Sequence, residues 1–201
     1  MFATWLLMFG VGNVALDPSG NKAGTVHTFD VLDATGKRHT TKEWMEAKAI
    51  VLFIVSSECP ASSGYAPEFA RLFKSYGDKG VLFYGIYTDP DLTAQQATAH
   101  AKEHLIDYPV LLDPSQKLVG QTGAKRVPTA VILSPAGKIL YRGRVDDRYI
   151  SLGKKRPEPT QRDTENALSL VLAGKTPLAA ETEVIGCLLP KLTEPAERKP
   201  K

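Results

Sequence analysis

The sequence predicts a three-layer α/β fold, in which a mixed central sheet carries helices on both faces. Two apolar runs, at 49–55 and 80–87, have the length and composition of central strands covered on both sides. Segments with helical spacing of apolar residues follow both runs, and a Ser-Pro-Ala-Gly turn at 134–137 joins two later strands into a hairpin. Because strands alternate with helices and then two strands follow in succession, the sheet must be mixed.

The individual elements are predicted from periodicity, caps and breakers. The Thr-Thr-Lys-Glu pattern at 40–43 has the form of a capping box, and Gly77 and Gly80 end the helix that follows the first buried strand. The elements expected in chain order are a strand at 25–33, a short capped helix at 40–45, a strand at 49–55, a helix at 59–76, a strand at 80–87, a helix from 93 to about 104, a short extended piece at 108–113, a helical turn at 115–120, strands at 126–133 and 138–143, and a helix at 160–172.

The domain organisation expected from this pattern is one domain at 25–174 with a segment at each end. Residues 1–24 are largely apolar and resemble an atypical export signal, which would place the protein in the periplasm or cell envelope; a first strand of the fold is the alternative reading. Residues 175–201 form a tail, in which 186–190 is apolar enough to dock on the domain. If residues 1–24 are no signal, a cytoplasmic location is expected.

Composition excludes several classes of protein. The chain of 201 residues is 43% hydrophobic and 23% charged, which is typical of a globular domain, and its net charge of +3 is too small to indicate nucleic-acid binding. Two cysteines cannot form a structural zinc site alone. No cofactor or metal site is expected, since His100 and His104 lie four residues apart on a charged helix whose face we expect to be solvated.

The segment Ser56-Ser57-Glu58-Cys59-Pro60 is the strongest functional signal in the chain. It places Cys59 directly after a buried strand and at the start of a helix, where free N–H groups and the helix dipole stabilise a thiolate. The thiolate is the nucleophilic form of cysteine, so this arrangement predicts thiol chemistry. A buried and inert cysteine at the end of a strand is the alternative.

The order of elements, with Cys59 after a core strand and Val127-Pro128-Thr129 before a later one, resembles the thioredoxin fold. More narrowly, residues 25–172 resemble the redoxin branch, which covers the alkyl hydroperoxide reductase and thiol-specific antioxidant type and membrane-anchored thioredoxin-like reductants. The resemblance places Cys59 at the nucleophile, Pro67 at the proline inside the active-site helix, and Pro128 at the cis-proline. It implies that Pro60, Val127 and Pro128 shape the substrate groove.

At several positions this sequence differs from the thioredoxin and peroxiredoxin patterns, and these differences limit the mechanisms that the chain can use. Thioredoxins carry a second cysteine three residues after the first, and this chain has Ser62 there, so no dithiol cycle can run within the motif. We expect Ser62 and Ser56 to hydrogen-bond the Cys59 sulfur. Peroxiredoxins carry a proline where this chain has Leu52, and their catalytic arginine aligns with Pro128, so that Arg126 is only nearby. Arg126 is a candidate for substrate binding, although a solvated loop position is the simpler reading.

The second cysteine, Cys187, leaves two hypotheses open. In the first, Cys59 attacks a disulfide or a peroxide, and Cys187 or an external thiol, from another protein or glutathione, resolves the intermediate. In the second, a Cys59–Cys187 bond is a structural staple of a non-catalytic module, which binds a partner protein or a metal. On that hypothesis the charged loop 146–159 is the candidate partner surface.

Overall fold

The computed structural model describes residues 24–192, and its centre is a mixed sheet of five strands in the order β5-β4-β3-β7-β8. The two inner strands are β3 (Ala49–Val55) and β4 (Val81–Tyr87), which run parallel in the register Ala49↔Val81. Strand β5 (Val110–Leu112) continues the parallel part, whereas β7 (Thr129–Leu133) and β8 (Ile139–Gly143) run antiparallel to their neighbours. The predicted mixed α/β sheet is confirmed.

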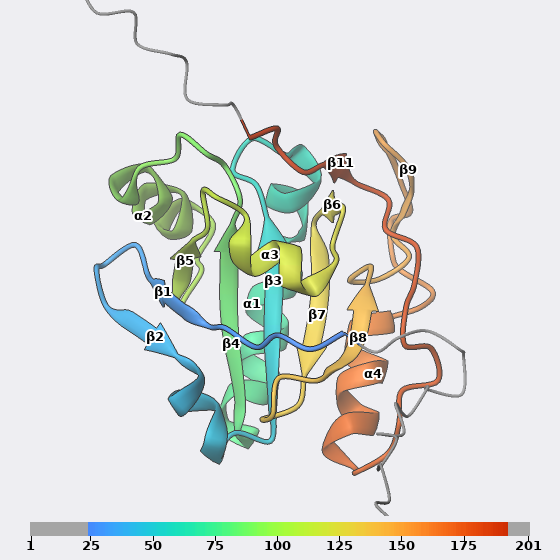
Figure 1. Ribbon diagram of the computed structural model, residues 1–201. Helices are drawn as coiled ribbons and strands as arrows, with labels where there is room; N and C mark the ends of the chain where they lie inside the picture. The colour runs from blue at the N-terminus through green and yellow to red at the C-terminus, as the bar shows by residue number, and fades with distance from the viewer. Residues whose placement is uncertain (1–23, 193–201) are drawn as a thin grey trace, which may run out of the picture.

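Helices cover both faces of the sheet (Figure 1). One face packs against α1 (Pro60–Tyr76), α2 (Ala94–Glu103) and α4 (Asp163–Leu172). The other face packs against α3 (Lys117–Thr122), the 3₁₀ helix η1 (Thr41–Glu46) and the segment before it. Because β3 is buried on both faces, its sequence is continuously apolar rather than alternating.

Side chains of β3 alternate between the two halves of the core. Phe53 stacks on Phe69 of α1, with ring centroids 4.1 Å apart, while the neighbouring Leu52 and Ile54 belong to the opposite half. This two-sided packing fixes the direction of β3 and therefore the place at which the chain leaves it. That place is the start of α1, where Cys59 lies.

Short strands lie outside the central sheet. The predicted strand at 25–33 is a bridge at Thr25 followed by β1 (Asp30–Leu32), which pairs with β2 (Arg38–Thr40) in a separate hairpin. The loop 146–159 contains a second hairpin, β9 (Tyr149–Ser151) and β10 (Lys154–Lys155). Two further short strands, β6 (Arg126–Val127) and β11 (Cys187–Leu188), pair at the edge of the molecule that carries the start of α1 (Figure 1).

The starts of two helices differ in how they are capped. The capping box at 40–43 was wrong: Thr40 makes no side-chain cap, and the turn is a 3₁₀ helix. At the start of α2, Thr93 forms a complete capping box with Gln96.

The apolar segment 1–24 lies outside the described residues except for Gly24. None of the helices between residues 24 and 192 is both long and apolar enough to cross a membrane.

Candidate active site

Cys59 occupies the N-cap of α1, as the sequence predicts. Its backbone N–H donates to the Ser56 carbonyl at 3.3 Å, which closes a tight turn between β3 and α1, and Pro60 takes the first helical position. Proline suits that position because its missing N–H would be unpaired there in any case. The sulfur therefore lies at the positive end of a helix of 17 residues, in a side chain only 3% exposed.

The structure joins Cys59 to Cys187 in a disulfide across 128 positions of sequence, with the two Cα atoms 6.2 Å apart. Cys187 reaches this place because its backbone pairs with β6: Cys187 lies opposite Val127, and Leu188 lies opposite Arg126. The tail therefore docks as expected, and it does so as a strand. The sulfurs of both cysteines therefore meet at the start of one helix.

Val127 and Pro128 form the floor of this site. The peptide bond between them is cis, as the resemblance implies for Pro128. The Val127 carbonyl oxygen lies 3.6 Å from the Cys59 sulfur, and Thr129 holds the turn by donating from its hydroxyl to the Arg126 carbonyl at 2.6 Å. Val127 and Pro128 are buried, whereas Pro60 and Arg126 remain exposed at the rim.

The hydroxyls of Ser56 and Ser62 bond to other partners in this disulfide form. Ser56 donates to the Asp89 carboxylate at 2.5 Å, and the Ser62 oxygen accepts the Ser56 N–H at 3.4 Å. Asp89 also accepts the Ser57 N–H at 2.9 Å. The expected hydrogen bonds to sulfur are therefore not made in this form, and both serines instead hold the turn that carries Cys59.

Arg126 contacts the tail. Its guanidinium donates to the Gly186 carbonyl at 2.9 Å, so this exposed side chain holds the segment that carries Cys187. Gln116 makes the corresponding contact at the other end of the segment, donating to the Pro190 carbonyl at 2.7 Å. The sequence carries no signal for Gln116, because the contact depends on a partner 74 positions away.

His100 lies behind the site and not on a solvated face, which corrects that expectation. Its Nδ1 is 2.6 Å from the Tyr87 hydroxyl, and its Nε2 is 3.5 Å from the Ser63 hydroxyl, next to Ser62 in α1. Burial, followed by the neighbouring His104, lowers the pKa of His100. The neutral imidazole is therefore favoured beside α1.

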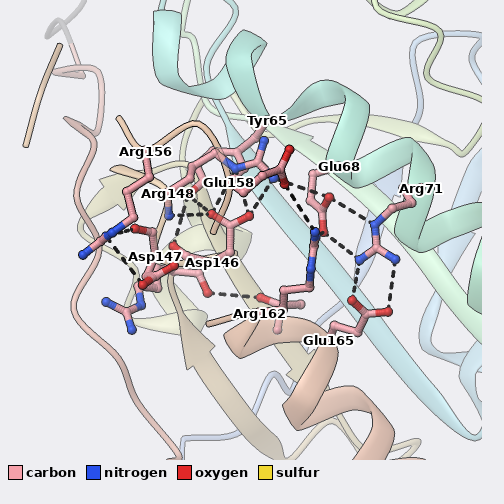
Figure 2. Close-up of polar contacts among 12 residues, drawn as sticks. Tyr65, Glu68, Arg71, Asp146, Asp147, Arg148, Arg156, Glu158, Arg162 and Glu165 are labelled. Atoms are coloured by element: carbon pink, nitrogen blue, oxygen red, sulfur yellow. Dashed lines mark hydrogen bonds and ion pairs between the residues drawn. The ribbon is translucent and has the colours of Figure 1, made fainter. Parts of the chain in front are cut away.

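An ion-pair network fixes the loop 146–159 against α1 and α4 (Figure 2). The fully buried Asp146 carboxylate accepts from Arg148 at 2.6 Å and from the Tyr65 hydroxyl at 2.8 Å. Glu68 of α1 pairs with Arg71, Arg148 and Arg162; although burial raises the pKa of Glu68, these arginines outweigh it and the pKa is lowered. Within the loop, Asp146 and Arg148 form a local ion pair whose charged groups are largely buried.

Comparison with known proteins agrees with this geometry. Residues 18–155 match the Redoxin family. The chain belongs to that family. The thiol-disulfide oxidoreductases ResA of Bacillus thuringiensis (strain Al Hakam) and Bacillus anthracis are each 26% identical over 112 residues, 56% of this chain and 63% of theirs. The chain thus spans less than two thirds of the length of these relatives.

Solved structures share the fold of this redoxin. A hypothetical protein from Sinorhizobium meliloti 1021 superposes with a TM-score of 0.73 at 24% identity, covering 83% of this chain and 92% of its own. A thiol-disulfide oxidoreductase from Bacteroides fragilis superposes with a TM-score of 0.52 at 24% identity, covering 59% and 88%. The thioredoxin-like fold is confirmed, and the relationship to thiol-disulfide oxidoreductases is distant.

Proposed function

We propose that this redoxin is a thiol–disulfide oxidoreductase in which Cys59 is the nucleophile and Cys187 its internal partner. The observation that carries the proposal is the disulfide between Cys187 and a cysteine at the N-cap of α1. A thiolate at a helix N-terminus is stabilised, and a stabilised thiolate is also a good leaving group in exchange. The same bond can therefore be formed and broken.

The cycle consists of two exchange steps. The Cys59 thiolate attacks one sulfur of a protein disulfide; that disulfide breaks, its other sulfur leaves as a thiolate that takes a proton from water, and a mixed disulfide remains on Cys59. The Cys187 thiolate then attacks the Cys59 sulfur and releases the second substrate thiol. The substrate gains two electrons and two protons. Two external thiol groups, from another protein or from two glutathione molecules, then reduce the Cys59–Cys187 bond by two further exchange steps and are themselves joined in a disulfide.

A disulfide substrate fits the site better than a peroxide. Peroxide chemistry requires a cation beside the sulfur to hold the developing charge. The nearest arginine expected from the sequence, Arg126, donates to the Gly186 carbonyl and holds the tail. Stoichiometric hydrogen peroxide should therefore oxidise the reduced protein slowly, as intact mass would record; rapid oxidation at Cys59 would favour a peroxidase.

The rival function is a non-catalytic module with a structural disulfide, and burial of Cys59 at 3% exposure favours it. The reduction potential separates the two. We expect equilibration in glutathione or dithiothreitol buffers to give a value above about −300 mV, since structural disulfides lie below it.

Turnover tests the cysteine roles directly. We expect Cys59→Ser to abolish reduction of a disulfide-containing test protein such as insulin. Cys187→Ser should accumulate the mixed disulfide on Cys59, visible as an adduct by intact mass. Retained turnover in Cys59→Ser, or an unchanged steady-state rate in Cys187→Ser, would contradict the proposal.

A further inference from the structure

The segment 186–190 lies in a seat built by β6, the preceding Lys125, and Gln116, which directly precedes α3. Within this seat Cys187 is bonded to Cys59, and its backbone pairs antiparallel with Val127. Leu189 continues the contact by donating its N–H to the Lys125 carbonyl at 3.3 Å. An extended chain whose cysteine is joined to the Cys59 sulfur is therefore what this edge of the protein accommodates.

Two side chains hold the main chain on either side of the cysteine. Arg126 donates to the carbonyl of Gly186, directly before Cys187, and Gln116 donates to the carbonyl of Pro190, three residues after it. Both acceptors are main-chain carbonyls, which every polypeptide presents. These contacts therefore require an extended backbone but no particular side chains.

Gln116 makes its contact with the tail from an unfavourable backbone conformation. Its φ of 53° is in the left-handed region, which a residue other than glycine rarely adopts. The same side-chain nitrogen also lies 3.3 Å from the Thr88 carbonyl, so the amide bridges the end of β4 and the tail. Residues held in this way are concentrated at binding sites.

The seat discriminates at the position before the cysteine. Gly186 is buried, and a Cβ added there would lie 2.9 Å from the Val127 carbonyl carbon and closer still to its oxygen. That neighbour is main chain and cannot rotate away. The position after the cysteine is open, since Leu188 is 69% exposed, whereas Leu189 packs against the core.

We propose that this seat selects polypeptide chains with glycine directly before the reacting cysteine, and that segment 186–190 is its built-in occupant. Arg126 and Gln116 are the positioning residues for the bound main chain. The inference rests on the proposed function and deepens it, because it names the class of substrate and the residue that the seat selects.

The test uses the full-length Cys187→Ser protein and a peptide with the sequence of residues 183–192, whose cysteine carries thionitrobenzoate. The Cys59 thiolate attacks the peptide sulfur, the bond to thionitrobenzoate breaks, and the coloured thiolate that leaves reports the rate. We expect Gly186→Val in the peptide to slow capture by at least about tenfold, because the clash is with main chain. Leu188→Ala in the peptide should change the rate by less than about twofold, since that side chain is exposed.

Variants of the protein test the two positioning residues. Arg126→Ala and Gln116→Asn should each slow capture of the glycine peptide by about threefold to tenfold, the loss expected for one hydrogen bond. Lys117→Ala, which removes an exposed charge from α3, is the matched control and should leave capture unchanged. Each variant is also reacted with dithiobis(nitrobenzoate) alone, and its rate with the peptide is expressed relative to this rate, which reports the intrinsic reactivity of Cys59.

The small disulfide also separates failure of this inference from failure of the proposed function. Normal reaction of Cys59 with dithiobis(nitrobenzoate), together with equal rates for the glycine and valine peptides, would overturn the selectivity and leave the oxidoreductase proposal standing. Failure of Cys59 to react with either reagent would overturn both.

Discussion

Cys187 lies opposite Val127 in an antiparallel pair, and the Val127 carbonyl oxygen is at the same time 3.6 Å from the sulfur of Cys59. One residue of β6 thus contacts both halves of the disulfide, one through backbone pairing and the other through its carbonyl. The two cysteines are brought together by this strand, although 128 positions separate them in sequence.

Loss of the disulfide should lower stability. Because the bond closes a loop of 128 positions, breaking it releases a large part of the unfolded chain from constraint. We expect Cys187→Ser to reduce the free energy of unfolding by about 2–5 kcal/mol relative to the oxidised protein. Urea unfolding of the oxidised, reduced and variant proteins measures this; equal midpoints for the oxidised and reduced proteins would contradict it.

Ser62→Cys should create a competing partner for Cys59. Two residues three positions apart at the start of a helix are close enough for a disulfide to join them. The loop from 59 to 62 is also much shorter than the loop from 59 to 187, so its closure costs less entropy. Since Cys59 can form only one bond, we expect the oxidised variant to carry a fraction of free Cys187. Alkylation followed by peptide mapping detects it, with the oxidised natural chain as the control; complete protection of Cys187 in the variant would refute the prediction.

The Glu68 network should contribute to stability, because it joins α1 to α4 and to the loop after β8 (Figure 2). Glu68→Gln leaves three arginines without their shared, buried carboxylate, and we expect a loss of about 1–3 kcal/mol in the free energy of unfolding. Glu158→Gln is the matched control: Glu158 is 85% exposed, and its ion pair with Arg162 is long, at 3.9 Å. Its effect should stay within about 0.5 kcal/mol, and equal losses in both variants would contradict the assignment.

Asp33 should make stability depend on pH in the acid range. Burial raises the pKa of its carboxyl, but hydrogen bonds from Thr35, His39 and Lys37 outweigh burial and lower it to about 2 from 3.8. A carboxyl whose pKa is lower in the folded protein stabilises the fold at pH values above its pKa in the unfolded chain. This stabilisation is lost as the pH falls toward the pKa in the folded protein. We therefore expect the stability difference between the natural chain and Asp33→Asn to shrink between pH 3.8 and about 2.

Urea unfolding of both proteins at neutral pH and at several acid values measures this dependence. At neutral pH the difference should be about 1–3 kcal/mol, as for removal of a hydrogen-bonded buried carboxylate. Asp91→Asn, at an exposed turn position, is the control for loss of one surface carboxylate, and its effect at neutral pH should stay within about 0.5 kcal/mol. A difference for Asp33→Asn that stays constant down to pH 2 would be inconsistent with the lowered pKa.

The fold and the position of Cys59 could be predicted because their signals are local. A continuous apolar run gives β3, and the helical spacing after it gives α1, so their junction places Cys59. The contacts of Gln116 and Arg126 with the tail could not be predicted, because both acceptors are carbonyls in a segment without periodicity. The capping box at Thr40 failed since the same residue pattern also occurs in a 3₁₀ turn, where the side-chain bond is not made.

Because Cys187 is carried by the tail and not by α1, the oxidised protein has a closed covalent ring from residue 59 to residue 187. Four strands of the central sheet lie inside this ring, and β3 lies just outside it. A force applied to the two chain ends cannot extend the residues inside the ring until the bond is reduced. At about 3.4 Å per residue, reduction adds roughly 430 Å to the length that the stretched chain can reach.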